Sequence, residues 1–189
     1  MSEASGETGN GAHRSALKSA APEKAFYFRN PVAQDACKVN DLVAASRPLD
    51  VNSLYCNLLQ CTHFAQTCLL AEQDGEIRGW VSGYRPADDP TTLFVWQVAV
   101  HECARGRGLG IDLLQRFVRL PAAAGASHLK TTITPSNHAS RALFTRFAEK
   151  EGLSLETRLW FDTVVHFAGR HESEILYSIG SLPLRDSSN

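Results

Sequence analysis

The sequence has 189 residues, with 19 Lys and Arg against 20 Asp and Glu, and a formal net charge of −1. This balance excludes a protein that mainly covers nucleic-acid phosphates, because that task concentrates Lys and Arg far above the acidic count. The longest strongly apolar run, Leu93 to Val100, is far shorter than the roughly 20 residues that cross a bilayer. We therefore expect a soluble protein with no nucleic-acid or membrane partner.

The chain is expected to form one domain at residues 25–182. Residues 1–24 are rich in Ser, Ala, Gly, Glu and Lys and predict a disordered tail, and residues 183–189 are expected to fray. The N-terminus lacks the apolar stretch of a secretory signal, which favours a cytoplasmic location. The five cysteines are odd in number and lack C-x-x-C spacing, so free, buried thiols are predicted.

Hydrophobic periodicity predicts eleven elements. In chain order, we predict a strand at 25–29, helices beginning near Asp35 and near Asp50 or Asn52, strands at 68–72, 77–84 and 93–100, a helix at 109–119, a strand at 129–134, a helix at 139–150, and strands at 155–161 and 174–179. Leu54, Leu58 and Leu59 are predicted to form the apolar face of the second helix. The order predicts an α/β (α+β) fold, with a mixed central sheet of about six or seven strands and helices on both faces.

A glycine-rich loop, Arg105-Gly106-Arg107-Gly108-Leu109-Gly110, leads from the strand at 93–100 into a helix. It matches neither the dinucleotide fingerprint G-x-G-x-x-G nor a Walker loop. Glycines let backbone N–H groups approach a ligand, and a helix N-terminus favours an anion, so the loop suits a pyrophosphate. An ordinary glycine-rich turn is the alternative. The pattern Arg105-x-x-Gly108-x-Gly110 resembles the acyl-CoA loop of the GNAT N-acetyltransferase superfamily.

A second segment, Asn137-His138-Ala139-Ser140-Arg141-Ala142-Leu143-Phe144, resembles the Asn-x-x-[Ala/Ser]-x-x-Leu-Tyr motif of the same superfamily. The resemblance implies a GNAT fold in which the strands at 93–100 and 129–134 splay apart around the pantetheine arm of acetyl-CoA. Phe144 replaces the tyrosine that protonates the leaving thiolate in many relatives, so the general acid stays unassigned. The residues implied for acetyl-CoA are Val98, Val100, Arg105, Gly106, Arg107, Gly108, Leu109, Gly110 and Asn137.

Acetylation of an amine requires a neutral nucleophile, so a base must accept a proton from the ammonium group. Three polar segments are candidates for that site: 48–57, 92–97 with the threonines at 131–134, and 166–174. Helix capping by Asp50 or Asn52 and core packing of Trp96 are the alternative interpretations. The His and carboxylate spacing at 166–174 fits no common metal motif, so we predict no metal.

Segments 49–64, 92–100, 131–140 and 166–172 closely resemble the L-2,4-diaminobutyrate N-acetyltransferase family of ectoine biosynthesis. The resemblance implies acetyl transfer from acetyl-CoA to the γ-amino group of L-2,4-diaminobutyrate, giving the precursor of ectoine, a compatible solute used in osmoprotection. Within that reading, Glu174 is our candidate base and the Val98 N–H our candidate donor to the tetrahedral intermediate. The predicted substrate-binding residues are Asp50, Asn52, Tyr55, Trp96, Gln97, Thr132, His166 and His171.

Two other functions fit parts of the sequence. Phe144 in place of the acid is compatible with a non-catalytic acyl-CoA-binding module. An acetyltransferase of another small amine, amino acid or peptide would share the same glycine loop. The GNAT resemblance also implies a homodimer.

Overall fold

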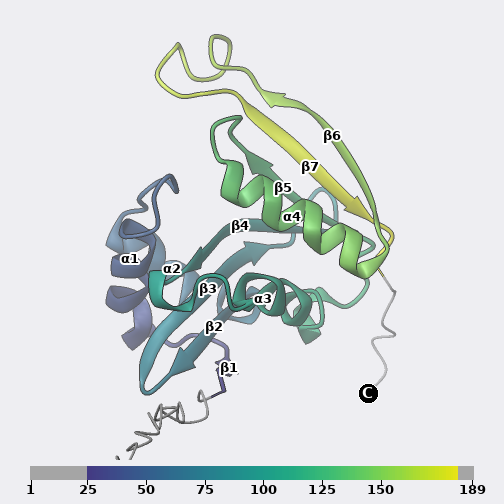
Figure 1. Cartoon of the computed structure of the whole chain (residues 1–189). Helices are drawn as coiled ribbons and strands as arrows, with labels where there is room; N and C mark the ends of the chain where they lie inside the picture. Colours follow the sequence, from purple (N-terminus) through teal and green to yellow (C-terminus); the bar gives the residue numbers. More distant parts are fainter. Residues whose placement is uncertain (1–24, 183–189) are drawn as a thin grey trace, which may run out of the picture.

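The structure is a computed structural model that describes residues 25–182, and it contains one seven-stranded sheet with the order β1-β2-β3-β4-β5-β7-β6. Helices cover both faces of the sheet (Figure 1). β4 and β5 are parallel, and the other neighbouring strands are antiparallel. The elements are β1 (Tyr27–Arg29), α1 (Ala36–Ala44), α2 (Leu54–Gln60), β2 (Cys68–Gln73), β3 (Glu76–Tyr84), β4 (Thr92–Val100), α3 (Leu109–Phe117), β5 (His128–Ile133), α4 (His138–Glu151), β6 (Ser154–Phe161) and β7 (Glu174–Gly180).

The predicted fold class and element order are confirmed. One core lies between the sheet and the helices α3 and α4, and a second lies between the sheet and α1. Alternate residues of β2 divide between them: Leu69 and Ala71 belong to the first core, and Cys68 and Leu70 to the second. This alternation is what a central strand covered on both faces requires.

The predicted apolar face of α2 is wrong. Leu54 and Leu58 are exposed, and the fully buried side chains of this helix are the amides of Asn57 and Gln60. The helical spacing was correct, but spacing alone cannot show which face of a short helix meets the protein. Buried amides need hydrogen-bond partners: Asn57 and Gln60 bond each other, and Asn57 also accepts from Asn40 on α1.

A bulge in β4 changes which side chains face each core. Successive residues of β3 pair with Gln97 and then with Val95, which leaves Trp96 as the extra residue. Val95 packs in the core beneath α3 and α4, and after the bulge Val98 and Val100 pack against that same core. The extra residue therefore turns Val98 and Val100 toward the face that carries α3 and α4.

The predicted splaying of two central strands is confirmed. β4 and β5 are paired where Thr92–Phe94 meet 128–130, and among the residues that the structure describes the rest of β4 has no strand partner on that side. The hairpin of β6 and β7 extends beyond α4 (Figure 1). The open end of the strand pair gives access to the face between α4 and the segment that precedes α2.

All five cysteines are free, as predicted, but only Cys61 and Cys68 are buried. Burial raises the pKa of the Cys61 thiol to about 11 and that of Cys68 to about 12. Within residues 25–182, no helix has both the length and the apolar character to cross a membrane. The predicted tail at 1–24 and the fraying at 183–189 lie outside the described residues.

Candidate active site

Three adjoining cavities form a channel along the splayed strands. The substrate cavity, of about 310 Å³, shares Leu49 and Asn137 with a middle cavity of about 230 Å³. The middle cavity shares Val100, Arg105 and Leu143 with a loop cavity of about 480 Å³. The channel therefore joins the polar end near α2 to the glycine loop that precedes α3.

The glycine loop has the geometry of an anion site. Gly106 and Gly108 have φ values of +74° and +81°, and a Cβ at either position would have no atom within 4 Å. Gly108 is the N-cap of α3, whose first backbone N–H groups and positive dipole end lie at this cavity. Both glycines are required for the backbone conformation and both leave open space, which fits a pyrophosphate held against the backbone.

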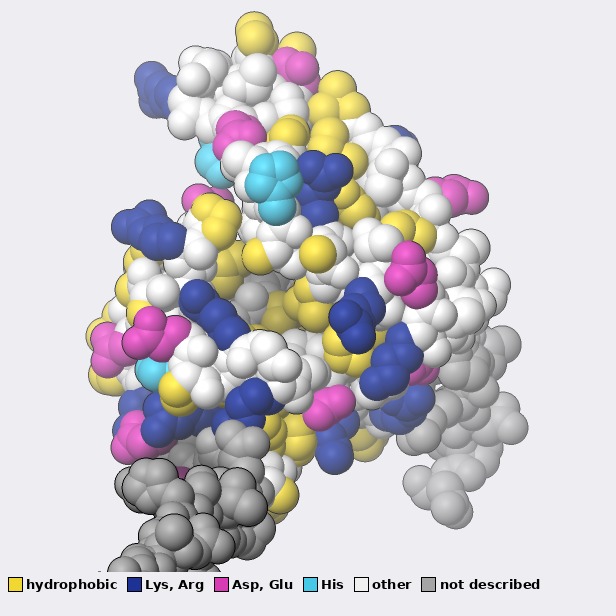
Figure 2. Space-filling view, viewed as in Figure 1, with side chains coloured by type: hydrophobic (Ala, Val, Ile, Leu, Met, Phe, Trp, Pro, Cys, Tyr) yellow, Lys and Arg dark blue, Asp and Glu magenta, His cyan; other side chains and the backbone are white. Residues whose placement is uncertain are grey.

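Cationic side chains surround the loop cavity. Arg105 comes from the loop, and Arg146 and Lys150 reach the cavity from α4. Figure 2 shows this face hollowed near its centre, with Lys and Arg side chains along the lower rim. Arg146 and Lys150 were missed from the sequence, because helical periodicity marked them only as polar residues on an exposed face.

Arg107 contributes backbone to the loop, but its side chain points elsewhere. Its guanidinium lies 4.4 Å from the ring centroid of Phe26 and donates to Gln73 at 3.1 Å. Arg105 Nε donates to the Val100 carbonyl at 3.1 Å, so this arginine fixes the point where β4 meets the loop. Of the two arginines in the motif, only Arg105 lines the loop cavity.

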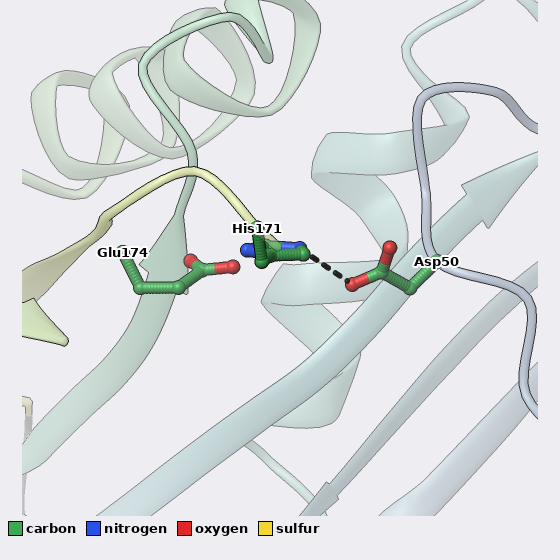
Figure 3. A group of neighbouring side chains, drawn as sticks. All are labelled: Asp50, His171 and Glu174. Atoms are coloured by element: carbon green, nitrogen blue, oxygen red, sulfur yellow. Dashed lines mark hydrogen bonds and ion pairs between the residues drawn. The ribbon is translucent and has the colours of Figure 1, made fainter. Parts of the chain in front are cut away.

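The substrate cavity brings together three ionisable groups from distant segments. His171 lies between Asp50 and Glu174 (Figure 3), and His171 Nε2 is 3.2 Å from Asp50 Oδ2. The nearest ligand atoms of the three groups lie within 4.8 Å of one another, a spacing that would also admit a small cation. The Asp50 side chain is 76% exposed, whereas Glu174 is half-buried at the start of β7. Two carboxylates around a narrow polar space favour a cationic ligand.

Burial raises the pKa of Glu174, although a hydrogen bond from Thr132 and the charge of His171 act in the opposite direction. Within the described residues, Glu174 Oε2 is buried and has no hydrogen-bond partner. The pKa of His171 is raised, first by its hydrogen bond to the Glu172 carbonyl and also by the charge of Asp50. The site thus holds a carboxylate that gains protons readily beside an imidazole that keeps its proton.

The remaining lining of the substrate cavity comes mostly from β4, β5 and the hairpin of β6 and β7. Phe161 and Phe167 were missed from the sequence, because the hairpin brings them back over the sheet only in the folded chain. The candidate base Glu174 lines this cavity, together with the predicted substrate residues Asp50, Asn52, Trp96, Gln97, Thr132 and His171.

Two predicted substrate residues do not line the cavity. Tyr55 lies on the outer face of α2 and is 68% exposed, because it stands two residues, about half a helical turn, before the buried Asn57. His166 is exposed and accepts a hydrogen bond from the Asp162 backbone N–H at 2.8 Å, so its ring stabilises the turn after β6. Both predictions assumed that neighbours in sequence share one cavity.

Two residues of the second superfamily motif have structural roles. The Asn137 side chain accepts from Ser140 N at 3.0 Å and caps α4, while the same residue lines the middle and substrate cavities. Phe144 is buried in the core beneath α3 and α4, whereas its neighbour Leu143 lines the channel. In this chain, position 144 serves packing.

The fold and the channel define an acetyltransferase of the GNAT type, and residues 39–148 match the model of the acetyltransferase (GNAT) family. The chain is 42% identical over 166 residues to the L-2,4-diaminobutyric acid acetyltransferase of Vibrio cholerae serotype O1, covering 88% of this chain and 94% of that protein. It is 45% identical over 150 residues to the enzyme of the same name from Methylotuvimicrobium alcaliphilum, covering 79% and 87%. The chain therefore belongs to the L-2,4-diaminobutyric acid acetyltransferase family.

A solved structure supports the same relationship. The diaminobutyrate acetyltransferase EctA from Paenibacillus lautus, in complex with its substrate L-2,4-diaminobutyric acid and coenzyme A, superposes on this chain with a TM-score of 0.80. The two sequences are 35% identical, and the match covers 86% of this chain and 98% of that chain.

Proposed function

We propose that this protein transfers the acetyl group of acetyl-CoA to the γ-amino group of L-2,4-diaminobutyrate. The observation that carries the proposal is the channel from a glycine loop suited to a pyrophosphate to a cavity with two carboxylates. The product would be N-γ-acetyl-diaminobutyrate, the precursor of ectoine, formed in the cytoplasm and serving osmoprotection. The position of the acetyl group is tested by NMR of the product, in which acetylation on the α-amino group would contradict the proposal.

The chemistry requires a proton transfer and a new C–N bond. Glu174 accepts a proton from the γ-ammonium group, directly or through water, and the neutral amine attacks the thioester carbon. The Val98 N–H donates to the carbonyl oxygen while it carries negative charge. The C–S bond then breaks and CoA leaves as a thiolate, which needs little acid assistance because thiols have a pKa of about 8.5. The nitrogen gives up its second proton, to the departing thiolate or to water, and becomes the neutral amide.

The substrate cavity matches a small amino acid with two ammonium groups. Asp50 supplies a second carboxylate for the cationic groups, and His171, which bonds the Asp50 carboxylate and the Glu172 carbonyl, orients Asp50 toward the cavity. Trp96, Gln97 and Asn52 form the walls around these charges. A volume of about 310 Å³ is enough for one small amino acid.

Replacing two cationic side chains of the loop cavity should weaken binding of acetyl-CoA but not of acetyl-dephospho-CoA, which lacks the 3′-phosphate. The double variant Arg146→Ala/Lys150→Ala is expected to raise the KM for acetyl-CoA about tenfold, because both side chains line the loop cavity where the 3′-phosphate would lie. The KM for acetyl-dephospho-CoA should change less than twofold. Lys38→Ala, which removes a cation from α1, is the control. Equal effects on both cofactors would contradict this role.

We also propose that the protein forms a homodimer, because two apolar surfaces remain exposed. One lies on α2 and beside it, and the other lies on the end of β6 and the turn that follows it. Groups of neighbouring exposed apolar side chains are uncommon on monomers and mark interfaces. The exposed apolar residues are Val51, Leu54, Tyr55, Leu58 and Phe64 in the first surface, and Leu159, Trp160, Phe161, Val164 and Val165 in the second.

Sedimentation tests the dimer. Val164→Asp/Val165→Asp is expected to convert the protein to a monomer, because each charge would be buried without a partner in the interface. The double variant should also raise the KM for the amine, since the same hairpin carries Phe161 and Phe167 over the substrate cavity. Tyr27→Asp changes an exposed aromatic residue on β1 that belongs to neither surface, and should leave the mass unchanged. A monomeric parent protein would refute the proposal.

A further inference from the structure

A chain of amide side chains connects the interior of α2 to the substrate cavity. Asn57 and Gln60 are 0% and 1% exposed, although the exposed face of the same helix carries leucines. Within the described residues, Gln60 Nε2 is buried without a hydrogen-bond partner, which lowers stability. An apolar inner face would have been more stable here, so the amides call for an explanation beyond packing.

Each bond in the chain is short and correctly directed. Asn57 Nδ2 donates to Gln60 Oε1 at 2.9 Å, and Asn40 Nδ2 donates to Asn57 Oδ1 at 2.8 Å. Asn40 lies on α1, and its same amide nitrogen donates a second bond, at 2.9 Å, to the Asn52 carbonyl. Asn40 therefore uses both of its hydrogens, one toward α2 and one toward the segment before α2.

The chain continues from that segment to the sheet. Asn52 Nδ2 donates to Gln97 Oε1 at 2.7 Å, and Gln97 Nε2 donates to the Asp50 carbonyl at 2.7 Å. Gln97 is buried beside the bulge in β4. Residues 50–53 form no helix or strand, so these side-chain bonds join the segment both to α1 and to the sheet.

The segment held in this way carries Asp50, whose side chain is 76% exposed. Its carboxylate pairs with the His171 imidazole. An exposed carboxylate has many rotamers, and its position relative to Glu174 depends on where its own backbone is fixed. The two bonds to the carbonyls of Asp50 and Asn52 fix that backbone.

We propose that Asn40 and Asn57 are positioning residues, which set the substrate affinity by holding the 50–53 segment against β4. Neither residue lines the substrate cavity. They act through Asn52 and Gln97, which do. The inference rests on the proposed function for its substrate, a diamino acid, but the ordering of the 50–53 segment can be measured without any substrate.

Asn40→Asp tests the proposal, because it preserves shape and removes both donated hydrogens. The KM for diaminobutyrate is expected to rise at least tenfold, and the KM for acetyl-CoA to stay within twofold. Amide hydrogen exchange across residues 49–53 should become faster. Asn40→Ala removes the same two donors without adding charge, and it replaces the aspartate variant if that variant fails to fold. It should give the same rise in the KM for diaminobutyrate and the same unchanged KM for acetyl-CoA.

Gln60→Leu is the matched control. Gln60 lies at the far end of the chain of amides, and within residues 25–182 its oxygen accepts from Asn57 alone, so its loss should alter the melting temperature but neither KM. A wild-type KM for diaminobutyrate in a folded Asn40 variant, or equal effects of the Asn40 and Gln60 variants, would overturn the inference. If the parent protein does not acetylate diaminobutyrate, the proposed function fails, and unchanged exchange at 49–53 separately refutes the positioning role.

Discussion

Glu174→Gln is expected to lower kcat by roughly 10²–10⁴, the contribution typical of a positioned general base. Glutamine keeps the shape of the side chain and can still accept a hydrogen bond from Thr132, but it cannot accept a proton. The KM for acetyl-CoA should not change, because Glu174 lines only the substrate end of the channel. Steady-state kinetics with saturating amine measures the effect.

The pH profile distinguishes loss of the base from misplacement of the substrate. In the parent protein kcat should fall as the pH drops through the raised pKa of Glu174, because only the ionised carboxylate accepts a proton. The glutamine variant should lose that acidic limb. Its rate should instead rise up to tenfold per pH unit toward the amine pKa of about 10.4, as solution supplies free amine.

The Glu174→Gln variant is expected to be at least as stable as the parent protein at neutral pH. The folded protein binds the Glu174 proton more tightly than the unfolded chain does, because burial raises the pKa. The free energy of unfolding therefore decreases as pH rises through the raised pKa, and glutamine removes that loss. The melting temperature at neutral pH should not fall.

Asp50→Asn, the matched change at the exposed carboxylate, should mainly raise the amine KM. Normal turnover by Glu174→Gln at neutral pH would exclude it as the base.

Gly108→Asp should weaken acetyl-CoA binding about 30-fold. A carboxylate at this position points into open space at the N-terminus of α3, where the pyrophosphate is expected. Two charges at about 8 Å and an effective dielectric constant of 20 repel by about 2 kcal/mol, which corresponds to that factor. Calorimetric titration with CoA measures the loss directly.

Gly108→Asn isolates the charge from the backbone conformation. Asn and Asp both tolerate the left-handed region better than other residues, and both can cap a helix, so the two variants should have similar melting temperatures. Only the aspartate should repel an anion. Equal CoA affinity in the two variants would show that the pyrophosphate lies elsewhere.

Most of the fold was predictable because the spacing of apolar residues differs between its buried strands and its buried helices. The strands of the sheet alternate or are apolar throughout, and α3 carries a regular apolar face with Leu109, Leu113 and Leu114 in the core. The faces of α2 could not be predicted, because its buried Asn57 is hydrogen-bonded by Asn40 on another helix. The spacing of residues along a helix shows which of them share a face, but only tertiary contacts decide which face is buried.

The candidate site was predictable where one short segment supplies it. The glycine loop is continuous in sequence, so its position at the start of α3 followed from local patterns. Arg146 and Phe161 reach the channel from α4 and β6, and no local pattern identifies such residues. Tyr55 and His166 were wrong for the converse reason, since neighbours of true cavity residues can lie on another face.

The measurement that tests the account most directly is CoA thiol release from acetyl-CoA by the purified full chain. The assay compares L-2,4-diaminobutyrate with ornithine, lysine and a panel of peptides at equal concentration. We expect the highest kcat/KM with diaminobutyrate, at least tenfold above the longer diamines, which place the second ammonium group farther from the α-carbon. No amine-dependent thiol release, or a preference for peptides, would contradict the proposed function.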